Sequence, residues 1–210
     1  MSRIVFFSIP AHGHTNPTVE VVRTLAARGH RVRYYSFEEF RARLEDAGAE
    51  FVPCDSYLPP APRDVERRIG RDFASLIGMV VDVTVAMEER VLGELAAFRP
   101  HCIVADSLCI WGKLYAERLG VPLVCSTTTF AFDQETAKGM RPSPAELLRT
   151  LAGLPRIGKK LALLRAHGYR AEKLTDLIQN DSSTDTIVYT SRAFQPGGER
   201  FGERVAFVGP

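Results

Sequence analysis

The stretch that decides the fold covers residues 3–25 and reads RIVFFSIPAHGHTNPTVEVVRTL. Residues 4–8 are a short run of β-branched and aromatic side chains, which is typical of a buried strand. Pro10 and Gly13 interrupt this run, because proline and glycine are the strongest local breaks in regular structure. The sequence therefore predicts a strand that ends in a tight loop.

A helix is expected directly after this loop. Asn16 is a suitable N-cap, and Pro17 suits the first helical position, where its missing N–H costs nothing. The apolar residues that then recur at helical spacing are Val21, Val22, Leu25 and Ala26. This prediction places His12 and His14 on the loop between the carboxyl end of a strand and the amino end of a helix. In open α/β sheets, ligands bind at such loops.

The rest of the chain repeats the strand–helix pattern. Strands are expected at residues 4–8, 31–36, 49–53, 101–106, 121–126, 186–190 and 204–208. Helices are expected at residues 38–47, 64–98 (one helix or two), 108–119, 144–151, 157–167 and 171–180. Ser107 is the expected cap of the helix at 108–119. Together these elements predict an α/β fold, a doubly wound Rossmann-like parallel sheet in the strand order 3-2-1-4-5 with right-handed crossovers.

The composition is that of an ordinary globular protein. The chain has 210 residues, of which 45% are hydrophobic and 25% charged, enough for one sizeable domain. A net charge of +2 does not argue for binding to nucleic acid. The sequence contains neither a signal-peptide pattern nor an apolar run that would span a bilayer, so we expect a cytoplasmic protein. The four cysteines have no C-x-x-C spacing and are expected to be buried, reduced thiols.

One segment is strongly basic. Residues 138–173 contain nine lysines and arginines but only two acids, an excess of +7. A membrane surface or an acidic partner could bind such a segment. A solvated helical face is the simpler interpretation, and at this point we prefer it.

The strand order brings two distant residues together. His14 lies beyond the first expected strand and Asp106 at the end of the fourth, and these strands are neighbours where the direction of sheet growth reverses. A carboxylate beside a histidine fixes its tautomer and leaves the other ring nitrogen as a base. His12 is a rival base. Alternatively, His14 packs at the helix start and Asp106 caps the next helix.

Several common cofactor and catalytic motifs are missing. The first loop has a single glycine rather than G-x-G-x-x-G, and the second strand ends in Ser36 rather than an acid, so an NAD site is not supported. No Walker A sequence, zinc-type spacing or G-x-S-x-G elbow occurs. The sequence therefore predicts neither a metal nor a bound organic cofactor.

Three stretches carry a resemblance to a known family. Residues 8–32 (SIPAHGHTNPTVEVVRTLAARGHRV) closely resemble the amino-terminal signature of the UDP-glycosyltransferase superfamily, in particular its bacterial macrolide glycosyltransferase branch. The agreement continues over residues 99–129 (RPHCIVADSLCIWGKLYAERLGVPLVCSTTT) and 204–210 (RVAFVGP), the latter resembling the last strand before an interdomain linker.

The resemblance implies half of a two-domain enzyme. Members of this family have the GT-B fold, two facing Rossmann-like domains, of which the amino-terminal one binds the acceptor and the other binds the nucleotide sugar. Residues 1–210 would be the acceptor domain, and no donor motif follows it. By the same resemblance, His14 is the base and Asp106 orients it in an inverting transfer from a UDP- or TDP-sugar. The hexosyltransferase would need its donor half, so this chain alone is expected to be inactive.

An apolar pocket is expected for a small, largely apolar acceptor such as a natural product. The candidate acceptor-binding residues are His12, Tyr57, Leu58, Phe73, Ile77, Met79, Met87, Phe130 and Phe132. Taken singly, large apolar residues are more often core than pocket. A non-catalytic binding module, or a helper subunit that docks a separate catalytic partner, is the alternative. The face that would meet the donor domain is expected to be partly apolar and to favour self-association.

Overall fold

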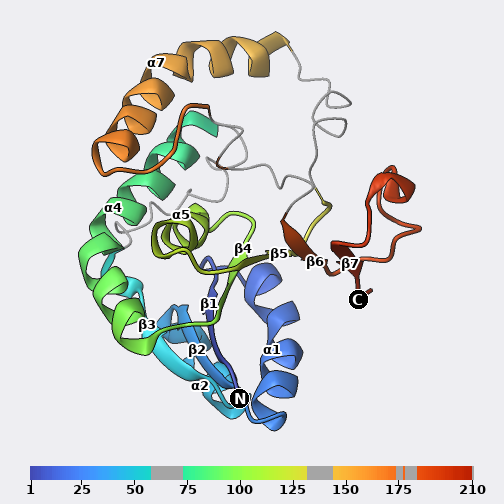
Figure 1. The fold of residues 1–210 in the computed structure, drawn as a ribbon. Helices are drawn as coiled ribbons and strands as arrows, with labels where there is room; N and C mark the ends of the chain where they lie inside the picture. Colours follow the sequence, from blue (N-terminus) through green and yellow to red (C-terminus); the bar gives the residue numbers. More distant parts are fainter. Residues whose placement is uncertain (58–72, 132–143, 174–176, 178–183, 210) are drawn as a thin grey trace.

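A computed structural model of the chain describes residues 1–57, 73–131, 144–173, 177 and 184–209. Within these residues the chain forms one seven-stranded, wholly parallel sheet in the order β3-β2-β1-β4-β5-β6-β7 (Figure 1). The strands are β1 (Arg3–Phe7), β2 (Arg31–Ser36), β3 (Glu50–Pro53), β4 (Cys102–Asp106), β5 (Leu123–Thr127), β6 (Asp185–Val188) and β7 (Val205–Phe207). The predicted order 3-2-1-4-5 is confirmed, and β6 and β7 extend the sheet beyond β5.

Helices cover both faces of the sheet. The α-helices are α1 (His12–Ala27), α2 (Arg41–Asp46), α4 (Phe73–Phe98), α5 (Ile110–Leu119) and α7 (Pro144–Ala166), and short 3-10 turns are η1 (Glu38–Phe40), η2 (Asp55–Tyr57) and η3 (Gly198–Arg200). α1 and α2 lie on one side of the sheet and α4 and α5 on the other, while α7 forms an outer layer on α4 (Figure 1). No helix in the described ranges has the length and apolar character needed to cross a membrane.

Alternating aromatic side chains build the two halves of the core. Phe6 of β1 stacks on Tyr34 of β2, with ring centroids 5.3 Å apart, on the side of α1. Phe7 stacks on Tyr35 at 4.8 Å on the opposite side and meets the edge of Tyr115 of α5 at 6.1 Å. Because neighbouring residues of a strand point to opposite faces, two adjacent pairs of rings serve both layers.

α5 lies very close to the sheet because residue 112 is a glycine. A Cβ atom at Gly112 would lie 2.5 Å from the Cβ of Ala105 and 3.1 Å from the ring of Phe7. Any larger residue would push α5 away from β4. Gly120 then ends α5 in the left-handed conformation, with φ of 63°. This close packing fixes the end of β4, where Asp106 lies.

The start of α1 differs from the prediction. The helix begins at His12, with Ala11 as its N-cap, and the backbone N–H groups of His14 and Thr15 both donate to the Ala11 carbonyl. Asn16 is therefore not the cap, and Pro17 lies inside the helix, where it cannot supply the bond that the carbonyl of Gly13 would accept. The preference of proline for the first turn was overridden by the burial of the helix against the sheet. The two histidines thus belong to the first helical turn rather than to a loop.

Other element ends also differ. The two helices predicted at residues 144–151 and 157–167 are one helix, α7, with Pro155 inside it. It continues past the proline because its inner side stays packed on α4. α5 begins at Ile110 with Cys109 as N-cap, so Ser107 does not cap it. The helix predicted at 171–180 falls largely outside the described residues.

The cysteines are free thiols, as the sequence predicts. Cys54, Cys109 and Cys125 are buried and Cys102 is half-buried. Burial raises the pKa of Cys54 to about 12 and raises the pKa of Cys109 well above its ordinary value. A raised pKa favours the neutral thiol, and the thiolate is the reactive form.

We therefore expect Cys54 and Cys109 to resist alkylation in the folded chain. At about pH 8 an ordinary thiol is partly ionised and reacts with iodoacetamide, whereas these two should react only when the chain is unfolded in urea. Mass spectrometry of labelled peptides measures this, and urea-unfolded protein is the control. Labelling of Cys109 in the native chain at the unfolded rate would contradict the burial described above.

Candidate active site

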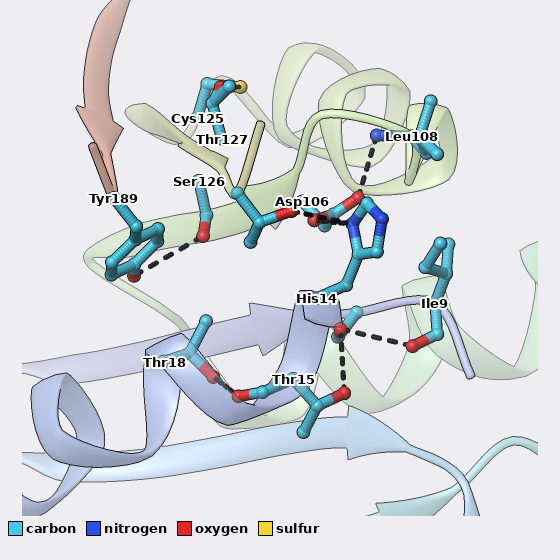
Figure 2. A network of polar contacts seen from close by, with 12 residues as sticks. Ile9, His14, Thr15, Thr18, Asp106, Leu108, Cys125, Ser126, Thr127 and Tyr189 are labelled. Atoms are coloured by element: carbon cyan, nitrogen blue, oxygen red, sulfur yellow. Dashed lines mark hydrogen bonds and ion pairs between the residues drawn. The ribbon is translucent and has the colours of Figure 1, made fainter. Parts of the chain in front are cut away.

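The carboxyl edge of the sheet brings His14 and Asp106 into direct contact. β1 and β4 pair in parallel, so the turn that follows β1 and the end of β4 lie at the same edge. Nδ1 of His14, in the first turn of α1, lies 2.7 Å from Oδ2 of Asp106 (Figure 2). The contact predicted from strand order alone is therefore present.

Asp106 is almost fully buried, with a side chain only 2% exposed. A buried carboxylate needs donors on its oxygens. The backbone N–H of Leu108 donates to Oδ1 at 2.9 Å, and Nδ1 of His14 faces Oδ2. This arrangement assigns the proton of the neutral imidazole to Nδ1. Nε2 is then the basic nitrogen, on a side chain that is 17% exposed.

Thr128 is a third member of the site, which sequence reasoning missed. Its Oγ1 lies 3.1 Å from Nδ1 of His14, beside the Asp106 oxygen. Thr128 directly follows β5, the neighbour of β4, so it emerges at the same edge of the sheet. The signal was present in the sequence as the polar run of residues 127–129 after a strand. A hydroxyl there offers Nδ1–H a second acceptor and restricts rotation of the ring.

Buried hydroxyl groups fix the position of α1 on the sheet, so that His14 reaches Asp106. Oγ of Ser8, just after β1, lies 3.1 Å from Oγ1 of Thr15. Thr18 donates to the carbonyl of Thr15 at 2.7 Å and lies 2.8 Å from the hydroxyl of Tyr34. Burial raises the pKa of Tyr34, so its hydroxyl stays protonated. These contacts join the first two turns of α1, which include His14, to β1 and β2.

Next to Thr128 the edge carries an aromatic pair. Phe130 is 41% exposed and Phe194, from the loop after β6, is 71% exposed, with ring centroids 5.8 Å apart. Buried Gln195 holds the two loops together, since its Oε1 accepts the N–H of Ala131 at 2.8 Å and its Nε2 donates to the Ala131 carbonyl at 3.1 Å. Phe194 and Gln195 were not among the predicted acceptor residues.

The other predicted acceptor residues are dispersed. Ile77 and Met87 of α4 are 2% and 1% exposed and belong to the hydrophobic core. Met79 is half-buried, and Tyr57 accepts a hydrogen bond from Nη1 of Arg90 at 3.0 Å.

Three of the predicted residues lie beyond the structural description. Leu58 and Phe132 are outside the described residues, as is the side chain of Phe73 at the start of α4.

His12 lies apart from the buried pair. Its side chain is 67% exposed, its Nε2 lies 3.8 Å from an oxygen of Glu39, and its ring meets the edge of Phe40 at 5.0 Å. These contacts are with η1, which follows β2 rather than β4. The geometry therefore favours His14 over His12 as a base oriented by a carboxylate.

The described part of the chain contains no group of three or more histidine, cysteine, aspartate or glutamate side chains that could hold a metal ion. What the edge offers is a buried carboxylate, an imidazole with one accessible nitrogen, a hydroxyl and exposed aromatic rings. Such a set can bind an apolar molecule and remove a proton from one of its hydroxyl groups.

Curated proteins are similar to this chain over nearly its whole length. A scan against protein-family models gave no match. The chain is 31% identical to demethyllactenocin mycarosyltransferase of Streptomyces fradiae, over all of this chain and 47% of that protein. It is 32% identical to an NDP-glycosyltransferase of Bacillus licheniformis, over 99% of this chain and 50% of that protein.

Solved structures show the same relation. The glycosyltransferase of kitacinnamycin superposes with a TM-score of 0.77 and 26% identity, covering 100% of this chain and 51% of that one. The chain thus spans about half the length of the curated relatives it matches. Since sequence and fold agree along its whole length, the chain belongs to the macrolide and natural-product glycosyltransferase family and corresponds to one half of a GT-B glycosyltransferase.

Proposed function

We propose that this chain is the acceptor-binding half of an inverting glycosyltransferase. The enzyme would transfer a sugar from a UDP- or TDP-sugar to a hydroxyl group of a small, largely apolar acceptor such as a natural product. The observation that carries the proposal is the 2.7 Å contact between Nδ1 of His14 and the buried Asp106. The relatives support the reaction class, since they include a mycarosyltransferase and an NDP-glycosyltransferase.

His14 is the base in this proposal. Nε2 accepts the proton of the acceptor hydroxyl while the hydroxyl oxygen attacks the anomeric carbon of the sugar. The new C–O bond forms as the bond to the nucleoside diphosphate breaks, and the diphosphate leaves with the electron pair. Attack from the side opposite the leaving group inverts the anomeric configuration.

Asp106 acts through His14. When Nε2 takes up the proton, the ring becomes an imidazolium, and the carboxylate at 2.7 Å from Nδ1 stabilises the new charge. Thr128 adds a second oxygen at 3.1 Å from Nδ1 and holds the ring plane. Both residues are positioning groups, because neither faces the nitrogen that meets the acceptor.

The aromatic pair supplies the apolar surface for the acceptor. Phe130 follows Thr128, the neighbour of the proposed base, by two residues in the sequence, and Phe194 packs against its ring. Exposed rings at a polar catalytic edge are suited to bind the flat or apolar part of a molecule whose hydroxyl must reach His14. The nucleotide sugar would be held mostly by the other half of the enzyme.

Replacement of His14 by alanine should abolish most of the transfer. In an enzyme that joins this chain to its donor-binding half, we expect turnover to fall by about 10²–10⁴-fold, the usual contribution of a general base. Acceptor affinity should change little, because the aromatic surface remains. Steady-state kinetics measure both quantities, and His12→Ala is the matched control. Near-normal turnover of His14→Ala together with loss in His12→Ala would show that the base is misassigned.

Asp106→Asn should act through the same nitrogen as His14→Ala. The substitution keeps the side-chain shape but removes the charge, so turnover should fall while the fold persists. Combined with His14→Ala it should add less than about tenfold, since residues that work as a unit are non-additive. A double-mutant cycle with circular dichroism as the folding control measures this.

Thr128→Val should cause a smaller loss of turnover than Asp106→Asn in the same kinetic assay. It removes one acceptor from Nδ1 and should lower turnover by only about fivefold, or about 1 kcal/mol for one hydrogen bond. Multiplicative losses from Asp106→Asn and His14→Ala would refute the paired action of these residues.

The 210-residue chain itself should bind an aglycone but transfer nothing. Calorimetric titration with a hydrophobic aglycone is expected to show binding without nucleotide sugar, because the acceptor surface is built from this chain. Incubation with the aglycone and UDP- or TDP-sugars should yield no glycoside above the blank. Measurable transfer by the purified chain would show that it also contains a donor site. Binding that persists after restoration of a donor half, without transfer, would favour a non-catalytic binding module.

A further inference from the structure

The side of α7 that faces away from the protein is apolar. Leu148, Leu151 and Leu154 are 70%, 52% and 51% exposed. Smaller apolar residues on the same side are exposed as well. We define the outer face of α7 as Leu148, Leu151, Ala152, Leu154, Pro155 and Ala162. A helix at the surface of a protein in water normally turns polar side chains outward, so this face requires an explanation.

The orientation of α7 is fixed by its inner side. Ile157, Leu161 and Leu164 are buried, and α7 packs along α4 as an outer layer (Figure 1). Gly153 allows close approach, since a Cβ atom there would lie 2.5 Å from the Cβ of Ala74. An ion pair between Lys160 and Asp82 of α4 joins the two helices. The helix therefore cannot bury its outer face by turning around.

The end of α7 is also anchored. Glu88 of α4 accepts a hydrogen bond from the hydroxyl of Tyr169 at 2.8 Å and pairs with Nδ1 of His167, just beyond the helix. The carboxylate is 14% exposed and lies 3.8 Å from Nη1 of Arg118 of α5. With α7 held both along its length and at its end, the outer face is a constant feature of the surface.

Basic residues border this apolar face. α7 carries five of them, Arg149, Arg156, Lys159, Lys160 and Arg165, and one acid, Glu146. At 100° per residue, Arg149 and Arg156 fall along one side of the outer face, whereas Lys159 and Arg165 fall within it. All four are exposed. Arg156 also donates to Oγ of Ser75, and Arg165 donates to the Ala171 carbonyl at 2.8 Å. Exposed leucines between cations are the pattern of a helix that lies in a membrane interface.

We propose that the outer face of α7 binds peripherally to an anionic lipid surface. The helix would lie in the plane of the membrane, with the leucines at the boundary of the acyl chains and the cations among acidic headgroups. Charge complementarity favours this occupant, since the border of the face is positive. Its shape also favours lipid, because a convex helix side with small residues between three leucines offers no aromatic anchor for a protein partner.

The sequence alone favoured a solvated helical face for this basic segment. That preference came from charge, which does not show which way the apolar residues of an amphipathic helix point. The structure changes the interpretation because the buried side of α7 is complete without the three exposed leucines. The proposal does not depend on the glycosyltransferase reaction.

Co-sedimentation with lipid vesicles tests the proposal directly. The 210-residue chain should pellet with vesicles that contain phosphatidylglycerol and much less with phosphatidylcholine alone, and high salt should weaken the binding. Lys159→Glu should lower the partition coefficient by about fivefold or more, since a single basic residue near an anionic surface contributes about that factor. Arg28→Glu, at the exposed end of α1, makes the same charge change elsewhere and should have little effect.

The contribution of the exposed leucines is tested with a second variant and its control. Leu148→Ser with Leu151→Ser should weaken binding by roughly tenfold, because partial burial of leucine side chains is lost. Val208→Ser is the control, as Val208 is 56% exposed on a different part of the surface. Circular dichroism confirms that each variant is folded.

Three results would overturn the proposal. The first is absence of binding to anionic vesicles, and the second is equal binding by the α7 variants and their controls. The third is concentration-dependent self-association, seen by analytical ultracentrifugation, that the leucine substitutions abolish while lipid binding is absent. In that case a second copy of the chain would be the occupant of the face.

Discussion

The parallel pairing of β1 with β4 is the constraint on which the site depends. Ile4 to Phe7 lie opposite Cys102 to Ala105, so a histidine near residue 14 and an aspartate at 106 reach the same edge. The close approach of α5, which Gly112 permits, fixes the end of β4. The buried hydroxyls of Thr15 and Thr18 fix α1 over β1 and β2. A change in either packing contact would move one partner and not the other.

The burial of Asp106 determines which nitrogen of His14 carries the proton. A carboxylate at the surface would be shared among water molecules, whereas Asp106 has two defined neighbours, the N–H of Leu108 and the ring of His14. The proton on Nδ1 is therefore held by the protein, and the exposed nitrogen is left without it. The site illustrates how a costly buried charge can be used to select one tautomer of a neighbouring base.

Much of this could be predicted from the sequence, for identifiable reasons. Strand runs such as RVRYYS, at residues 31–36, are short, β-branched or aromatic and end at turn residues, and the strand order then follows from handedness. Element ends were less predictable, since Pro17 and Pro155 lie inside helices that tertiary packing maintains. The polar run at residues 127–129 marked the end of a strand, but the contact of Thr128 with His14 and the packing of Phe194 on Phe130 arise only in the folded sheet. The sequence also could not show which apolar candidates are buried, since Met87 is 1% exposed and Phe130 is 41% exposed although both side chains are apolar.

Gln195 substitutes for a peptide group at the edge of the sheet. Its side-chain amide meets the backbone of Ala131 with one N–H and its carbonyl oxygen, as a peptide group would, and Nε2 also donates to the Pro196 carbonyl. The two loops are thus held together beyond Val188, where the strand itself ends. The consequence is evolutionary. The rings of Phe130 and Phe194 can be exchanged for other side chains while the two loops stay in place, provided that position 195 retains a primary amide. A glutamate would set its charge against the Ala131 carbonyl, and the two loops would separate.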